Sequence, residues 1–277
     1  MKKIEKKLRK LISIIKTKEL QPIPSPINTT ELLKDKVALI TGGSGGIGSA
    51  IAESFLKNGA KVIIAGTNEE KLENVTHKIS SGDNLASIII DVTDVGIFPQ
   101  KVDDAVKIFG KLDILVNSAG LLAHHNFLNM TESEYDAIMD VNAKGTYFMS
   151  QAVAKYMIKN HISGHILNIT SSSALRPAWT PYQMSKWAVR GFTLGAADVL
   201  LPYGIIVNAI APGPVATPML GKEQGDSIFH PEQPSGRYAM PSEIADMAVM
   251  LVSDMGNLVV GDTLYMTGGS GNLSYRH

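Results

Sequence analysis

The chain has 277 residues, of which 44% are hydrophobic and 19% are charged, so it is long and apolar enough to form a large buried core. It contains no cysteine, which excludes disulfides, thiolate nucleophiles and thiolate-bound metals. The formal net charge is zero, yet the first 20 residues carry eight Lys/Arg against two Glu, which gives this end +6 and the remainder −6. A main domain with that negative balance is not expected to bind nucleic acid.

Residues 1–20 predict a basic amphipathic helix, because Ile4, Leu8 and Leu11 fall on one helical face with lysines around the rest. Residues 21–30 contain three prolines and predict an extended linker. The sequence leaves three alternatives open for such a helix. It could lie on an anionic membrane surface, pack on a neighbouring subunit or stay partly disordered. We find neither an 18-residue apolar run nor a signal-peptide pattern. We therefore expect a cytoplasmic protein, with peripheral membrane contact through residues 1–20 as one alternative.

Residues 31–277 predict one α/β domain. Near-continuous apolar runs alternate with segments long enough for crossover helices, which is typical of a doubly wound parallel sheet of the Rossmann type, in three α/β/α layers. The expected strands are 37–41, 61–65, 87–91, 113–117, 165–169, 205–210 and 262–266.

The first expected strand runs into a glycine-rich turn, residues 42–48, and then into a helix. This order is the one that a dinucleotide pyrophosphate site needs. Gly42, Gly46 and Gly48 leave room for the backbone to approach the pyrophosphate, and the unpaired amides at the helix N-terminus donate hydrogen bonds to it. The α/β domain is therefore predicted to bind a dinucleotide.

The end of the second expected strand bears on the choice between NADP and NAD. It reads Ala65-Gly66-Thr67-Asn68, with no carboxylate to bind the adenosine ribose of NAD or to repel a 2′-phosphate, and no arginine to attract one. These residues favour NADP, with Thr67, Asn68 and Lys71 around the phosphate, and leave NAD as the alternative.

Two further strand ends face the same edge. Asp91 is placed to accept a hydrogen bond from the adenine amino group, or else to cap a turn, and both interpretations stand. Residues 117–120, Asn-Ser-Ala-Gly, close the fourth expected strand at the carboxyl edge, where open α/β sheets bind ligands. Their small side chains leave room for a cofactor.

The strongest chemical signal is the pair Tyr182 and Lys186. The spacing i, i+4 puts the phenol and the ammonium on one helix face. A positive charge beside a phenol stabilises the phenolate and lowers its pKa from about 10 toward the neutral range, which makes an acid/base. Taken alone, the same spacing also arises as an ordinary surface pair, so its weight depends on the surrounding motifs.

Six motifs stand in a fixed order along the chain. They are TGGSGGIG at 41–48, NSAG at 117–120, VNAKG at 141–145, ITSSS at 169–173, YQMSK at 182–186 and NAIAPGPVATPM at 208–219. On these motifs the segment from about Lys36 to Gly269 resembles the single-domain branch of the short-chain dehydrogenase/reductase family. The resemblance implies an enzyme that transfers a hydride between NAD(P)(H) and a small-molecule carbonyl or secondary alcohol. The competing interpretation is a non-catalytic dinucleotide-sensing regulator or scaffold, although such proteins generally lose the tyrosine or the lysine.

The resemblance also implies roles for four residues. Tyr182 would exchange the proton with the substrate oxygen, and Lys186 would depress the pKa of Tyr182 and hold the nicotinamide ribose. Ser171 would hydrogen-bond the substrate oxygen. Asn142 would anchor a water and proton relay to Lys186. Three consecutive serines leave Ser172 and Ser173 open as alternatives, and we favour Ser171 because it stands at the usual strand exit.

The expected cofactor contacts combine the motifs above with the nicotinamide loop that the resemblance implies after the sixth strand. They are Gly42, Ser44, Gly46, Ile47, Gly48, Thr67, Asn68, Asp91, Val92, Asn117, Ala119, Gly120, Tyr182, Lys186, Pro212, Gly213, Val215 and Thr217.

Substrate selectivity is expected in residues 121–126, Trp179, Met184 and a polar segment, 221–238, with the composition of a mobile lid. His124-His125 has no carboxylate or third histidine at ligand spacing, so we expect no metal there. Relatives associate through the helices expected at about 132–160 and 181–203, which implies a homodimer or homotetramer.

Overall fold

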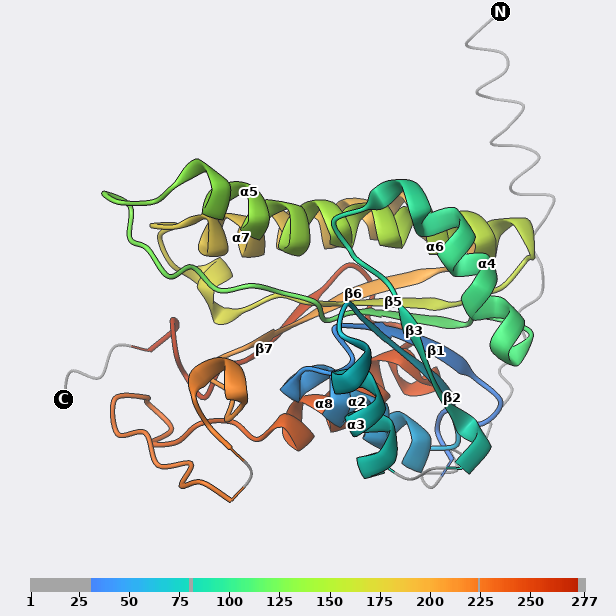
Figure 1. The fold of residues 1–277 in the computed structure, drawn as a ribbon, viewed down its shortest axis with the longest axis horizontal. Coiled ribbons are helices and arrows are strands. Elements are labelled where there is room, and N and C mark those ends of the chain that lie inside the picture. Colours follow the sequence, from blue (N-terminus) through green and yellow to red (C-terminus); the bar gives the residue numbers. More distant parts are fainter. Residues whose placement is uncertain (1–30, 80–81, 224, 274–277) are drawn as a thin grey trace, which may run out of the picture.

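The computed structural model describes residues 31–79, 82–223 and 225–273, so the helix predicted at 1–20 and the linker predicted at 21–30 lie outside the described residues. Within them, seven parallel strands form one sheet in the order β3-β2-β1-β4-β5-β6-β7 (Figure 1). This arrangement confirms the predicted doubly wound, Rossmann-type fold. The strands are β1 (Val37–Thr41), β2 (Lys61–Gly66), β3 (Leu85–Ile89), β4 (Ile114–Asn117), β5 (His165–Ile169), β6 (Ile206–Pro212) and β7 (Thr263–Met266).

The third strand begins and ends two residues earlier than predicted. Its register pairs Leu85 with Val62 and Ile89 with Gly66, the last residue of β2. One more hydrogen bond, from Ile90 N to Gly66 O at 3.0 Å, completes the pairing. Because β2 ends at Gly66, Asp91 has no strand partner and lies in the loop beyond the sheet edge.

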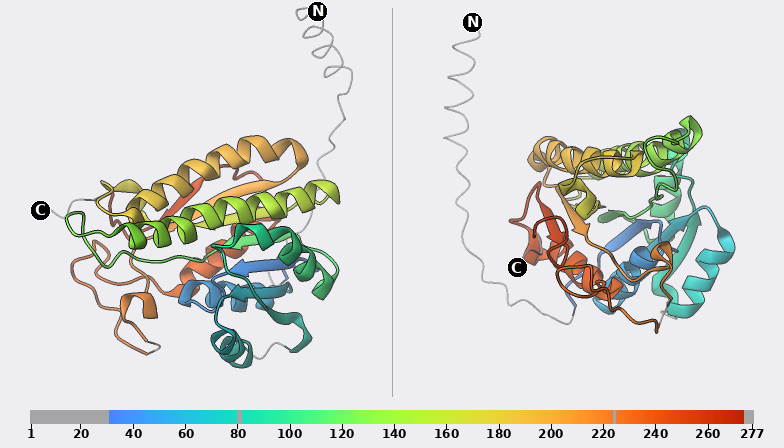
Figure 2. Two further views of the ribbon diagram at one scale, coloured as in Figure 1. Left: turned by 45° about the horizontal axis from the view of Figure 1, so that its top comes forward. Right: turned by 90° about the vertical axis from the view of Figure 1, so that its left-hand side faces the viewer.

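Helices cover both faces of the sheet (Figures 1 and 2). One face carries α2 (Gly46–Lys57), α3 (Glu69–Ile79) and α8 (Pro241–Val252), and the other carries α4 (Phe98–Phe109), α5 (Glu132–Met139), α6 (Thr146–Lys159) and α7 (Pro181–Leu200). No helix in the part of the chain that the structure describes is long and apolar enough to cross a membrane.

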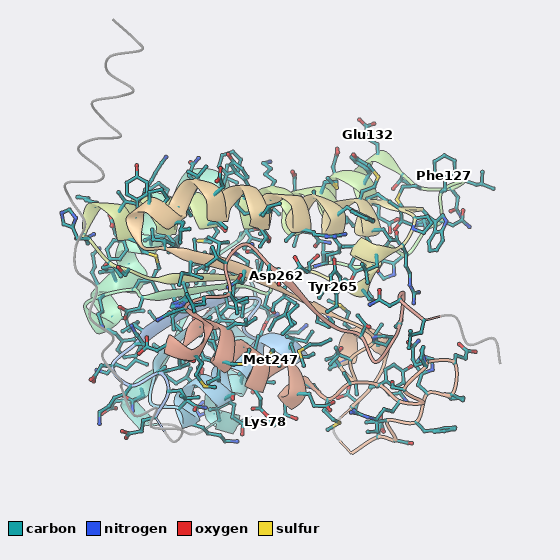
Figure 3. All side chains as sticks on the ribbon, turned by 180° about the vertical axis from the view of Figure 1, so that it is seen from behind. Lys78, Phe127, Glu132, Met247, Asp262 and Tyr265 are labelled. Atoms are coloured by element: carbon teal, nitrogen blue, oxygen red, sulfur yellow. The ribbon has the colours of Figure 1, made fainter. Side chains whose placement is uncertain are left out.

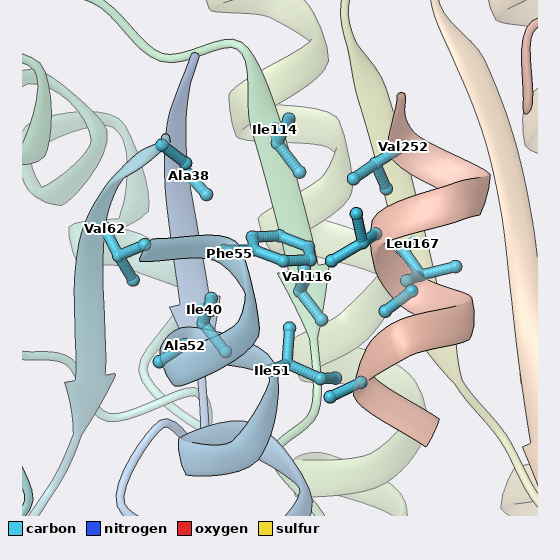
Figure 4. Packing of buried hydrophobic residues seen from close by; sticks show 14 of the residues in the cluster. Ala38, Ile40, Ile51, Ala52, Phe55, Val62, Ile114, Val116, Leu167 and Val252 are labelled. Atoms are coloured by element: carbon cyan, nitrogen blue, oxygen red, sulfur yellow. The ribbon is translucent and has the colours of Figure 1, made fainter. Parts of the chain in front are cut away.

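Strands β1 to β6 each contribute to two hydrophobic cores because successive side chains alternate between the faces. In β1, Ala38 and Ile40 pack under α2 and α8 around Phe55, whereas Val37 and Leu39 pack toward α4 and α6. Figure 4 shows the first of these cores, with Phe55 between α2 and the sheet. Fully burying a side chain of this size contributes about 1.5–3 kcal/mol, so both faces hold the sheet rigid beneath its carboxyl edge.

Local sequence signals set where α5 and α7 begin. Thr180 and Gln183 form a capping box and Pro181 occupies the first turn, so α7 begins directly before Tyr182. Thr131 caps α5, its hydroxyl accepting from Glu134 N at 3.2 Å.

The single helix predicted over about 132–160 is interrupted by a π-helical turn, Asp140–Gly145, between α5 and α6. Gly145 lies against the loop after β3, where an added Cβ would sit 2.6 Å from Val92 O. The π turn contains Asn142, whose side chain reaches the loop after β4. Such turns are frequent at functional sites.

Candidate functional site

The candidate site lies at the carboxyl edge of the sheet, where the strand order reverses between β1 and β4. A cleft opens there between the glycine-rich turn and the start of α7. Its lining comprises Gly42, Gly45, Gly46, Ile47, Gly48, Ser118, Gly120, Ile169, Thr170, Tyr182, Lys186, Thr217 and Met219. Residues far apart in the sequence therefore meet at one place.

Three glycines of the turn, Gly42, Gly46 and Gly48, have no space for a side chain. Gly42 has φ +64°, and an added Cβ would lie 2.7 Å from the backbone of Ala119. A Cβ on Gly48 would lie 2.3 Å from Gly42 O, and one on Gly46 would lie 2.6 Å from Cγ2 of Thr217. Because no side chain caps the N-terminus of α2, its first amides face the cleft as donors. This backbone cradle fits a pyrophosphate.

The region expected to hold the adenosine ribose is built from small polar groups. The hydroxyl of Ser44 lies 3.5 Å from the point where a Cβ of Gly66 would sit, which places it beside the end of β2. Thr67 is exposed directly after that strand. Asn68 is partly engaged, because its Oδ1 accepts from Lys71 N at 2.8 Å and caps the first turn of α3.

Two of the predicted cofactor residues have side chains that are engaged elsewhere. Asp91 Oδ1 accepts hydrogen bonds from Thr93 N at 2.9 Å and from Thr93 Oγ1 at 2.7 Å, which is the turn-forming interpretation. Asn117 is buried, and its Nδ2 donates to Ser150 and Asn168, both at 2.9 Å. The side chain of Asn117 thus lies beneath the site, where it ties β4 to β5 and α6.

Tyr182 and Lys186 lie on the face of α7 that borders the cleft. The ammonium of Lys186 is 5.6 Å from the centre of the Tyr182 ring and donates to Ile169 O at 3.1 Å. The lysine is 6% exposed, and this burial lowers its pKa to about 8.

The surroundings of Tyr182 differ from the simple expectation of a depressed pKa. Burial raises the pKa of this phenol, and a hydrogen bond with Ser171 acts in the opposite direction. Desolvation is therefore the larger influence on the pKa of Tyr182. Binding of a cationic nicotinamide beside the phenol would favour its ionised form.

The structure distinguishes the three consecutive serines. Ser171 follows β5, hydrogen-bonds the Tyr182 phenol and also accepts from Ser173 N at 3.1 Å, which caps the short helical turn Ser172–Leu175. That turn leads Ser172 and Ser173 away from the strand end. Ser171 is thus the serine that the structure brings to the tyrosine.

Asn142 lies 1% exposed in the π turn and holds the backbone next to the site. Its Oδ1 accepts from Leu121 N at 2.7 Å, and its Nδ2 donates to Leu121 O and to Ser185 Oγ, both at 3.0 Å. An added Cβ on Gly120 would lie 3.5 Å from Asn142 Oδ1 and 3.7 Å from Lys186 Nζ. Asn142 and Lys186 therefore flank Gly120 at the floor of the cleft.

The segment after β6 is fixed in place beside the cleft. Gly213 N donates to Met266 O at 2.9 Å, and Val215 forms an isolated bridge with Ala239. The buried Thr217 packs against Gly46 of the glycine-rich turn. Residues 212–217 are thus held next to the pyrophosphate cradle.

Sequence reasoning missed one contact. Glu134, on α5, accepts hydrogen bonds from the backbone of His124 and His125. No sequence pattern indicated this contact, because it depends on how the loop after β4 folds back toward α5. Among the described residues, no group of three or more His, Cys, Asp or Glu is arranged to hold a metal ion.

The arrangement is suited to proton exchange and hydride transfer. A buried ammonium, a serine hydroxyl and a phenol converge beside a backbone cradle for a dinucleotide. The phenol can exchange a proton with an oxygen that enters the cleft, and a dinucleotide held by the cradle would supply the hydride for the neighbouring carbon.

Comparison with known proteins agrees with this geometry. Residues 36–227 match the family model described as short chain dehydrogenase. The chain is 34% identical to a hydroxy(phenyl)methyl-succinyl-CoA dehydrogenase subunit of Thauera aromatica, covering 86% of this chain and 97% of the relative. It is also 34% identical to a 3-oxoacyl-acyl-carrier-protein reductase of Thermotoga maritima, covering 86% and 98%.

A solved structure shows the same likeness in three dimensions. A variant of actinorhodin polyketide ketoreductase with NADPH superimposes with a TM-score of 0.79 at 30% identity, covering 86% of this chain and 98% of that protein. Fold, motif order and relatives agree, and the chain belongs to the short-chain dehydrogenase/reductase family, whose members are NAD(P)-dependent oxidoreductases.

Proposed function

We propose that this enzyme reversibly reduces a carbonyl group to a secondary alcohol with Tyr182 as the acid/base. The observation that carries the proposal is that Tyr182 and Lys186 line the cleft beside the glycine-rich turn, with Ser171 at the phenol of Tyr182. A bound NAD(P)H supplies the hydride. Tyr182 gives its proton to the carbonyl oxygen during reduction, and takes it back from the alcohol during oxidation.

The neighbouring residues support the phenol in this role. Ser171 hydrogen-bonds the substrate oxygen as negative charge develops on it. The ammonium of Lys186 favours the ionised phenol electrostatically and would donate to the ribose hydroxyls of a bound cofactor. Asn142 keeps Leu121 in place and thereby shapes the floor next to Lys186.

Replacing Tyr182 with Phe tests the proposal, because this change removes only the hydroxyl. We expect kcat to fall by about 10²- to 10⁴-fold, the usual contribution of a positioned acid/base, while NADPH binding, followed by fluorescence titration, is retained. Undiminished turnover would refute the role of Tyr182. Wild-type protein that binds cofactor but turns over no carbonyl or alcohol would instead favour the dinucleotide-sensing regulator.

We propose NADP as the preferred cofactor. Ser44 and Thr67 offer hydroxyls beside the end of β2, where no carboxylate repels a 2′-phosphate. The related ketoreductase structure contains NADPH, which is consistent with this preference. Because no arginine stands at this position, the preference is expected to be modest.

Titration of the purified enzyme with NADPH and NADH measures this preference. We expect a lower Kd for NADPH, and in Thr67→Glu we expect weaker binding of NADPH with little change for NADH, because the new carboxylate repels the 2′-phosphate. A lower Kd for NADH in the wild type would contradict the assignment.

We also propose a homodimer or homotetramer formed through α6 and α7. Both helices run side by side over one face of the molecule (Figure 2) and expose large apolar side chains, namely Tyr147, Phe148, Leu194 and Val199. Light scattering of the purified enzyme tests this, and a monomer at micromolar concentration would contradict it.

A further inference from the structure

The segment that follows β4, residues 121–130, leads outward from Gly120, which lines the cleft together with Tyr182. We call it the β4 segment. It starts next to Gly120 at the floor of the cleft and ends in a turn over Asn126–Asn129, where Asn126 N donates to Asn129 Oδ1 at 2.9 Å. The turn exposes Phe127 and Leu128, and Figure 3 shows Phe127 at the outer end of the molecule.

Two side chains from one helical run hold the β4 segment. Asn142 binds both backbone polar groups of Leu121, and Glu134, eight positions earlier on the run through α5 and the π turn, binds the backbone at His124 and His125. The same rigid element therefore fixes the β4 segment at its start and at its middle.

The contacts of Glu134 are extensive for a residue at the molecular surface. One carboxylate oxygen accepts from His124 N at 2.5 Å and from His125 N at 3.3 Å, and the other is hydrogen-bonded to Nδ1 of His125. The side chain of Glu134 is 15% exposed. The hydrogen bond from His124 N, followed by the contact with the His125 ring, lowers the pKa of Glu134, so the carboxylate stays ionised at neutral pH.

At its position in α5, Glu134 would normally hydrogen-bond the backbone of the N-cap residue. Thr131 is the N-cap of α5 and Glu134 stands three residues later, the spacing at which a glutamate bonds back to the N-cap backbone in a capping box. Here its carboxylate is directed across to the β4 segment instead. The first turn of α5 still favours a negative charge at this place through the helix dipole.

We propose that Glu134 is a positioning residue for substrate binding. Its carboxylate holds the middle of the β4 segment, and this fixes the wall of the substrate approach between Leu121 and the exposed turn at Phe127. The role rests on the carbonyl reductase activity proposed above. It concerns the substrate and not the cofactor, because the pyrophosphate cradle lies at the glycine-rich turn after β1.

The test compares Glu134→Ala and Glu134→Gln with the wild type and with the matched control Glu132→Gln. Glu132 is an exposed residue of the same helical turn, which Figure 3 shows on the outer surface. Kinetics are measured with ethyl acetoacetate and with acetoacetyl-CoA at saturating NADPH, and backbone hydrogen exchange is followed for residues 121–127.

We expect Glu134→Ala to raise KM by about fivefold or more with kcat changed by less than about twofold, because substrate binding and not the chemical step loses its support. Exchange in residues 121–127 should be about tenfold faster, since the His124 and His125 amides lose their acceptor. Glu134→Gln keeps one acceptor oxygen and should recover part of both effects. Glu132→Gln should match the wild type, as should the Kd of NADPH in every variant.

Several outcomes would overturn the proposal. Unchanged exchange would show that the carboxylate does not hold the β4 segment, and faster exchange with an unchanged KM would show that the segment does not shape substrate binding. If Glu134→Ala does not fold, Glu134→Gln with wild-type KM and exchange would have the same meaning. No carbonyl turnover by the wild type at all would refute the proposed function and this role with it.

Discussion

The buried ammonium of Lys186 is the constraint on which the rest of the site depends. A cation taken out of water is costly unless polar groups surround it. Here the carbonyl of Ile169, at the end of β5, accepts a hydrogen bond from it, and the Tyr182 ring stands beside it. Burial lowers the pKa of Lys186 to about 8. Because this value is close to neutral pH, a charged group that enters the cleft can change the protonation of Lys186. A lysine held in this way is suited to favour an ionised phenol and to donate to a polar cofactor.

The surrounding structure keeps that lysine in place. Thr170 Oγ1 donates to Lys186 O at 2.9 Å, which anchors α7 to the end of β5. Beneath it, Asn168 accepts from Asn117 and donates to Thr193 at 3.0 Å, so a buried chain of hydrogen bonds connects β4, β5 and α7. Networks of this kind are rigid when each member is satisfied. Lys186 and Tyr182 therefore stand on a helix that hydrogen bonds tie to the strands beneath it.

The fold was predictable from the sequence because its signals are local. Apolar runs such as VALIT give the buried strands, and the turn after β1 contains Gly42 at a position that requires a positive φ. Tyr182 and Lys186 were predictable from helical spacing, and the family resemblance pointed to Ser171 and Asn142. Features that depend on tertiary packing could not be predicted from the sequence. The π turn at Asn142, the contact of Glu134 with His124, and the raised pKa of Tyr182 all depend on how the chain packs in three dimensions, which no local sequence pattern indicates.

We propose that the charge of Lys186 controls the ionisation of Tyr182. The most direct measurement is the pH dependence of kcat for alcohol oxidation at saturating cofactor, in the wild type and in Lys186→Met. In oxidation the ionised phenol accepts the proton, so kcat rises with pH through the pKa of Tyr182. Removing the nearby positive charge raises that pKa, and the rising limb should move to higher pH by about one unit or more. A limb at the same pH in both proteins would contradict the account.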